Sequence, residues 1–142
     1  MGTRIPPGRA APRLSPAALA ALSLALGACG GEDDRPATFE YIHAAILAPS
    51  CATSGCHSDL AEVAGINLES FDEAYVELTG RACDDGDASV RRYVVGGQPE
   101  ASQLMYLLLD IEVPRPMPPD LALPDPDIDL VERWILEGAP CR

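Results

Sequence analysis

The chain has 142 residues, and its 10 basic against 22 acidic side chains give a formal net charge of −12 at pH 7. This charge repels nucleic-acid phosphates and excludes a nucleic-acid role. It favours a partner with a basic docking surface. The simpler alternative is that the acidic side chains only keep the domain soluble. The sequence has two Phe, four Tyr and one Trp, so cross-links or a large apolar cofactor would help to stabilise its modest core.

The N-terminal residues have the composition of a signal peptide. Arg4, Arg9 and Arg13 give a basic start without acids, and an apolar run follows over residues 17–26. This run is too short for the ~20 residues that span a bilayer. A basic start, a short apolar run and then small residues predict a secretory signal peptide, here residues 1–28.

The end of the apolar run, LGAC, resembles the bacterial lipobox, whose cysteine becomes the lipidated first residue of the mature protein. The resemblance implies lipidation of Cys29 and a place in the bacterial cell envelope, anchored to a membrane and facing the periplasm or the outside. The alternative is ordinary cleavage nearby, which leaves a soluble secreted protein. Residues 29–37 are glycine-rich and acidic, which indicates a flexible tether, and residues 38–142 form one domain.

The domain opens with a predicted helix, TFEYIHAAILAP. Thr38 is placed to cap its N-terminus. Phe39, Ile42 and Ile46 lie on one helical face, and Pro49 is expected to end the helix.

The stretch SCATSGCHSD follows directly and contains Cys51, Cys56 and His57. A c-type haem is held by two cysteine thioethers, and the histidine after the second cysteine is an iron ligand. The usual gap between the cysteines is two residues. Here it is four, and Thr53 stands at the usual position of the first cysteine. The extra residues would have to bulge outward, which Gly55 and its small neighbours make sterically possible.

Three other uses of these residues stay open. A Cys51–Cys56 disulfide is feasible at this separation. A zinc site of Cys51, Cys56, His57 and Cys83 has the right ligand count, although adjacent residues rarely bind one tetrahedral ion and an oxidising compartment favours disulfides. Cys56 with His57 as a nucleophile–base pair would lack a third group that orients the base.

Two further helices are predicted in the middle of the chain. Ser70 and Glu73 are in capping-box register, and Gly80 is expected to end that helix. The next helix, SQLMYLLLD, begins near Ser102 and has no polar face, so we expect it to be mostly buried.

The last predicted helix is the clearest, with Asp125 as cap, Pro126 at the first helical position and Gly138 at its end. Its apolar stripe is formed by Ile128, Val131, Trp134 and Ile135. A proline-rich loop, residues 113–126, leads into it, and RRYVVGG is the only strand candidate. The predicted fold class is therefore mainly α, with about four short helices and long proline-rich loops.

In the order of these features the chain resembles a class I cytochrome c. A helix enters the cysteine–histidine turn, and the closing DLVERWILEGAP is similar to the family's last helix, which packs across the first. GINL is similar to the family's Gly-Pro-Asn-Leu segment, with Ile66 in place of proline. In the family that proline's carbonyl accepts the ring hydrogen of the histidine ligand and fixes its tautomer, and the Ile66 carbonyl offers the same acceptor. GGQPEASQLMYLLL resembles a stretch of bacterial cytochrome c-like lipoproteins that opens a helix at a serine.

The resemblance implies one covalent haem c, attached through Cys51 and Cys56, with the iron bound by His57 and by Met117 of MPPD. The prolines around Met117 restrict its loop; without a haem this methionine would be a gap-filling side chain. His43 is the other possible sixth ligand, although we expect it to face solvent.

The remaining cysteines, Cys83 and Cys141, are then expected to form a disulfide. We expect Met105 and Trp134 to lie in the core. The expected function is that of a membrane-anchored monohaem c-type cytochrome, which passes single electrons to a redox protein partner and is not an enzyme. The alternative is a disulfide-stabilised interaction module of the same fold without haem.

Overall fold

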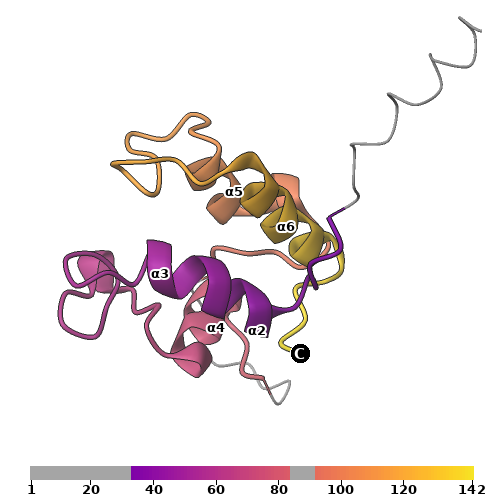
Figure 1. The fold of residues 1–142 in the computed structure, drawn as a ribbon, viewed down its shortest axis with the longest axis horizontal. Helices are drawn as coiled ribbons and strands as arrows, with labels where there is room; N and C mark the ends of the chain where they lie inside the picture. The colour runs from indigo at the N-terminus through magenta and orange to yellow at the C-terminus, as the bar shows by residue number, and fades with distance from the viewer. Residues whose placement is uncertain (1–32, 84–91) are drawn as a thin grey trace, which may run out of the picture. The chain divides into compact units, whose positions relative to one another are not determined.

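The structure is a computed structural model that describes residues 33–83 and 92–142. Within these ranges the chain is mainly helical and contains no β-strand (Figure 1), as the sequence predicts. The part of RRYVVGG that is described, residues 92–97, forms a loop. None of the helices in the described ranges is long and apolar enough to cross a bilayer. The predicted signal peptide and Cys29 lie outside the described residues.

The first helix is continuous and has a wide turn in its middle. Its parts are α2 (Phe39–Ile42), the π-helical η1 (His43–Leu47) and α3 (Ala48–Ser50). Thr38 Oγ1 accepts a hydrogen bond from the Tyr41 N–H at 3.4 Å and is the predicted cap. The prediction that Pro49 ends the helix is wrong. Because a proline ring crowds the carbonyl four residues before it, the wider π turn accommodates Pro49 and the helix runs to Ser50.

Local signals set the ends of α4 (Phe71–Thr79). The Ser70 hydroxyl accepts from the Glu73 N–H at 3.4 Å, which confirms Ser70 as the cap. The Glu73 carboxylate accepts from the Ser70 hydroxyl at 2.9 Å, and not from the Ser70 N–H as in a complete capping box. Gly80 follows with a φ of 69°, a left-handed conformation that glycine adopts without strain and that commonly ends helices. A short 3₁₀ turn, η2 (Val63–Gly65), precedes this helix.

The helix α5 (Gln103–Leu108) begins after Ser102, as predicted, and the 3₁₀ turn η3 (Pro99–Ala101) lies before it. The buried Ser102 hydroxyl does not cap the helix. It accepts from the Val95 N–H at 2.9 Å and donates to the Gln98 carbonyl at 2.8 Å. This serine therefore fixes the preceding loop against the start of α5.

The last helix, α6 (Asp125–Leu136), starts one residue earlier than predicted. Asp125 is its first helical residue, and no side chain caps its N-terminus, so the assignment of Asp125 as cap is wrong. Asp125 and Asp127 still lie in the first turn, where the positive end of the helix dipole favours them. The helix ends just before Gly138, as predicted.

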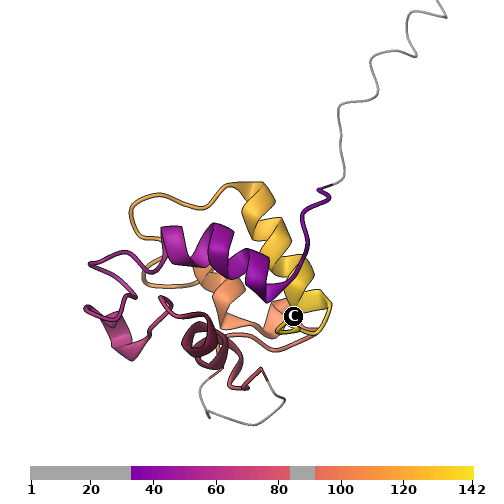
Figure 2. The same cartoon turned by 60° about the horizontal axis from the view of Figure 1, so that its bottom comes forward.

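Aromatic rings join three helices in the core. The Phe39 ring of α2 lies 5.3 Å from the Trp134 ring of α6 and 5.1 Å from the Tyr75 ring of α4, and Phe39 and Trp134 have no exposed surface. Figure 2 shows α2 and α6 side by side. Met105 is also buried, so both core predictions for Met105 and Trp134 are confirmed.

The C-terminal segment is fixed by a close approach and a disulfide. A Cβ on Gly96 would lie 2.5 Å from the Gly138 carbonyl oxygen, so only glycine fits there. The predicted disulfide between Cys83 and Cys141 is present, with its Cα atoms 5.4 Å apart. The Tyr75 hydroxyl adds a hydrogen bond to the Ala139 carbonyl at 2.9 Å.

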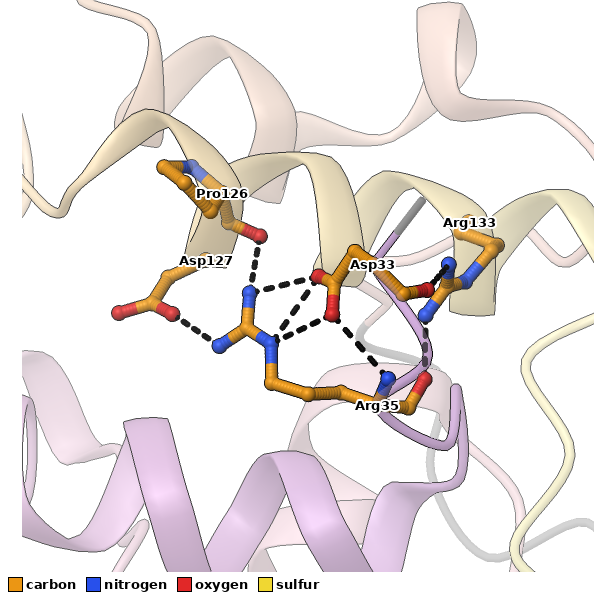
Figure 3. Close-up of polar contacts among 5 residues, drawn as sticks. All are labelled: Asp33, Arg35, Pro126, Asp127 and Arg133. Atoms are coloured by element: carbon orange, nitrogen blue, oxygen red, sulfur yellow. Dashed lines mark hydrogen bonds and ion pairs between the residues drawn. The ribbon is translucent and has the colours of Figure 1, made fainter. Parts of the chain in front are cut away.

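Charged side chains hold the start of the described chain on α6 (Figure 3). The Arg35 guanidinium pairs with the Asp33 carboxylate at 2.8 Å and with Asp127 at 2.5 Å, and it lowers the pKa of Asp33 to about 2. Arg133 donates to the Asp33 carbonyl at 2.8 Å and to the Arg35 carbonyl. Asp33 and Arg35 of the predicted tether, residues 29–37, are therefore held on α6.

Candidate functional site

All four side chains that the sequence assigns to haem binding line one pocket of about 240 Å³. We call it the Cys–His–Met pocket; its lining consists of Cys51, Cys56, His57 and Met117 with Ser50, Gly55, Val63, Arg115, Pro118 and Pro119. One wall is the turn after α3 and the other is the proline-rich loop after α5. Figure 1 shows these two segments on the same side of the domain.

Backbone hydrogen bonds shape the turn that carries the cysteines. The Cys51 N–H donates to the Leu47 carbonyl at 2.8 Å, which continues the helical bonding past α3. The His57 N–H donates back to the Cys51 carbonyl at 3.1 Å, and the Cys56 N–H donates to Thr53 at 2.9 Å. These bonds close the loop, so that Cys51, Cys56 and His57 reach the same pocket despite the four-residue gap.

The outward bulge that the sequence suggests consists of Thr53 and Ser54, because Ala52 packs against the core and Gly55 lines the pocket. Thr53, Ser54 and Gly55 are exposed, whereas Cys51 and Cys56 are half-buried. A Cβ on Gly55 would meet no atom within 4 Å. The bulge is therefore compatible with other small residues at position 55 and does not require glycine.

Both cysteines of the pocket are free thiols. The Cys51–Cys56 disulfide is thus not formed, and the zinc alternative fails because Cys83 is bonded to Cys141. In the described part of the chain no three His, Cys, Asp or Glu residues are placed to hold a metal ion. The free thiols of Cys51 and Cys56 remain available for covalent attachment of a ligand.

The His57 ring has an unpaired buried nitrogen. Its Nδ1 has no hydrogen-bond partner, so the bond to the Ile66 carbonyl that the resemblance implies is not formed. The segment is held instead by the backbone, where the Leu68 N–H donates to the His57 carbonyl at 2.8 Å. The Ser58 hydroxyl is also buried without a partner. Such groups cost about 1–3 kcal/mol each when they are left unpaired, and an ordered water or ion is one way to pair them.

Met117 lies in a wall between two cavities. Its N–H donates to the Leu107 carbonyl at 2.9 Å, which ties the proline-rich loop to α5. Met117, Pro118 and Pro119 also line a second cavity of about 320 Å³ together with Leu123 and other residues. The Cys–His–Met pocket is smaller than the ~300–1,000 Å³ of typical ligand sites.

The other candidate ligand, His43, lies elsewhere. It is half-buried, so the prediction that it faces solvent is wrong. Its Nε2 lies 3.2 Å from the Leu68 carbonyl and its ring is 5.7 Å from the Phe71 ring. His43 does not line the Cys–His–Met pocket, whereas Met117 does.

Sequence patterns do not point to two residues of the pocket, Val63 and Arg115. Val63 stands in a short exposed segment without periodicity. Arg115 stands between two prolines, a weak signal that its backbone is restricted.

Comparison with protein-family models, with curated proteins and with solved structures finds no match to this chain. The pocket residues and their geometry alone therefore carry the functional inference.

We expect the Cys51 thiol of the folded protein to react slowly with iodoacetamide. Burial, and then the neighbouring Cys56, raises the pKa of the Cys51 thiol from an ordinary 9.0 to about 11. At pH 8 the folded protein then holds about 100-fold less reactive thiolate than the unfolded chain. Alkylation with and without urea, followed by peptide mass analysis, measures the ratio; rates within about threefold of each other would contradict the buried position.

Proposed function

We propose that this protein is a membrane-anchored monohaem c-type cytochrome, of cytochrome c-like fold, that carries single electrons. The observation that carries the proposal is the Cys–His–Met pocket. Two segments far apart in the sequence bring two free thiols, an imidazole and a thioether to one cavity.

These donors fit a haem c by their chemistry. The thiols of Cys51 and Cys56 are the groups that form thioether bonds, and His57 and Met117 are an axial ligand pair used by c-type cytochromes. The haem would supply a one-electron couple of ferrous and ferric iron. Because protein side chains would fill both axial positions, no position is left for a substrate, which favours an electron carrier over an enzyme.

The chain's residues have separate tasks in this function. Val63, Pro118 and Pro119 line the pocket with apolar surface, and apolar surroundings lower the local dielectric and tune the redox potential. The Met117 thioether favours the reduced state and raises the potential. The unpaired His57 Nδ1 would be satisfied by an ordered water.

Another cavity, lined by acidic side chains, supports a basic redox partner. Glu62, Asp72, Glu73 and Glu77 line a cavity of about 330 Å³, and Glu62 precedes Val63 of the Cys–His–Met pocket. A basic protein docked there would be steered by charge and would sit next to the haem. Its association rate would fall as salt screens the acids.

Export and lipidation complete the proposal. The signal peptide of residues 1–28 and the lipidated Cys29 would place the domain in the bacterial cell envelope, attached to a membrane.

The spectrum and the mass of the exported protein test the proposal. Protein from a host with haem-attachment machinery should be red, with a Soret band, a reduced α-band and the added mass of one haem. The alternative, a haem-free interaction module of the same fold, predicts a second disulfide between Cys51 and Cys56 and no added mass. A colourless protein with that second bridge would replace the proposal by the alternative.

A Met117→Ala variant tests the sixth ligand. We expect the haem to stay attached, the low-spin spectrum to become high-spin, and the midpoint potential to fall because the thioether no longer favours ferrous iron. Met105→Leu is the matched control, since Met105 lies in the core outside the Cys–His–Met pocket. An unchanged low-spin spectrum in Met117→Ala would remove this methionine from the ligand set.

A further inference from the structure

Arg115 is the one charged side chain that lines the Cys–His–Met pocket. It is exposed and lies two residues before Met117. In the described part of the chain both ion pairs belong to Arg35. The guanidinium of Arg115 therefore has no acidic partner within the described domain, although the chain as a whole carries a net charge of −12.

Arg81, which follows α4, and Arg133 of α6 differ from Arg115 because they donate hydrogen bonds to backbone carbonyls. Arg81 donates to the Gly138 and Ala139 carbonyls at 3.1 and 2.9 Å. Arg133 donates to backbone carbonyls near the start of the described chain. Arg115 thus combines unused donors with a place at the rim of an apolar cavity.

A ligand that suits this rim has an apolar body and an anionic edge. Haem has both, because its ring is apolar and its propionate side chains carry carboxylates at one edge. A guanidinium binds a carboxylate through two parallel hydrogen bonds, and this pairing is stronger than one between neutral groups. Pro114 and Pro116 restrict the backbone on both sides of Arg115, so its side chain starts from a defined position.

We propose that Arg115 binds a propionate carboxylate of the haem in the Cys–His–Met pocket. The inference rests on the proposed function, since it requires a haem in this pocket. Arg115 would then orient the ring and balance its charge, in addition to the attachment by the two cysteines.

The midpoint potential of the haem-loaded protein gives the first test. A positive charge beside the haem disfavours ferric iron, so Arg115→Gln should lower the potential. Arg115→Lys keeps the charge but loses the paired hydrogen bonds, and its potential should lie between those of Arg115→Gln and the wild type. Arg92→Gln is the matched control, because Arg92 is exposed, lies outside the pocket lining and removes the same charge. At high salt the effect of Arg92→Gln should vanish while that of Arg115→Gln persists.

Chemical protection gives the second test. Phenylglyoxal modifies free guanidinium groups, and peptide mass analysis reports each arginine separately. We expect haem loading to slow the modification of Arg115 by about tenfold or more, since a paired charged hydrogen bond has to open first. Arg92 should react at the same rate with and without haem.

The outcomes separate this inference from the proposed function. Protection of Arg115 together with a salt-resistant fall in potential in Arg115→Gln would support it. Two results would overturn the inference and leave the cytochrome intact. In the first, Arg115 of the haem-loaded wild type stays as reactive as in the haem-free protein. In the second, Arg115→Gln and Arg92→Gln shift the midpoint potential equally. A wild type that never takes up haem would overturn both.

Discussion

A Cys51→Ala, Cys56→Ala double variant, produced with haem-attachment machinery, is expected to carry no covalently bound haem. Both sulfurs line the Cys–His–Met pocket as free thiols, and without them no thioether bond can form. The measurement is the mass of the denatured protein, with its absorption spectrum after acid extraction of loosely held haem. A haem mass that stays on the denatured variant would show that the attachment lies elsewhere in the chain.

The second cysteine pair provides the matched control for this experiment. Cys83→Ala with Cys141→Ala also removes two sulfurs, but from a disulfide that lies outside the pocket. This variant should be less stable and should still carry the haem mass. If both double variants lost the haem equally, the loss would reflect unfolding and would not identify the attachment site.

The four-residue gap can be tested by moving the first sulfur. Thr53 stands where the first cysteine of the usual two-residue gap would be, and it is exposed on the outer side of the turn. Because Thr53 does not line the Cys–His–Met pocket, we expect Cys51→Ala combined with Thr53→Cys not to recover the second thioether bond that Cys51→Ala loses. Recovery of that bond would mean that the turn can rearrange to the usual two-residue gap.

A Trp134→Ala variant is expected to lose about 3–5 kcal/mol of the free energy of unfolding. Trp134 has no exposed surface, and its ring lies 5.3 Å from that of Phe39. The substitution would leave a cavity at the contact between α2 and α6, which a close-packed core fills only in part. Urea unfolding followed by far-ultraviolet circular dichroism measures the effect, since this variant has no tryptophan left as a fluorescent probe.

Trp134→Phe separates packing from hydrogen bonding at the same position. The indole Nε1 donates to the Pro140 carbonyl at 2.8 Å. Phenylalanine keeps most of the ring contact and loses this bond, so we expect a smaller cost of about 1–2 kcal/mol. Equal losses in the two variants would indicate that the hydrogen bond, and not the aromatic contact, dominates at Trp134.

Features that depend on neighbouring residues are predictable from the sequence. The Ser70 hydroxyl caps the Glu73 N–H at the start of α4, and Gly80 ends that helix, because both effects act within one turn. The start of α6 is ambiguous for the same local reason. An aspartate is favourable both as a cap and in the first turn, so the pattern around Asp125 fits either position.

Features that depend on distant packing are not predictable in this way. The sequence places a carbonyl at Ile66 for the His57 ring, yet Nδ1 is unpaired, because ring orientation depends on the whole turn. Arg115 reaches the pocket only because the proline-rich loop lies against the cysteine turn. A proline alone predicts that the first helix ends at Pro49. The helix continues through a π turn instead, because its packing against the rest of the domain is continuous.

The Cys83–Cys141 bridge has a consequence for the durability of the molecule. It closes a covalent ring that contains α5, Met117 and α6, whereas Cys51 and His57 lie before the ring. A single protease cut inside the ring therefore produces no separate fragment, and the nicked chain keeps both walls of the pocket in one molecule. The two walls of the pocket would separate after a cut between His57 and Cys83. They would also separate if the disulfide were reduced and the chain were cut between Cys83 and Met117.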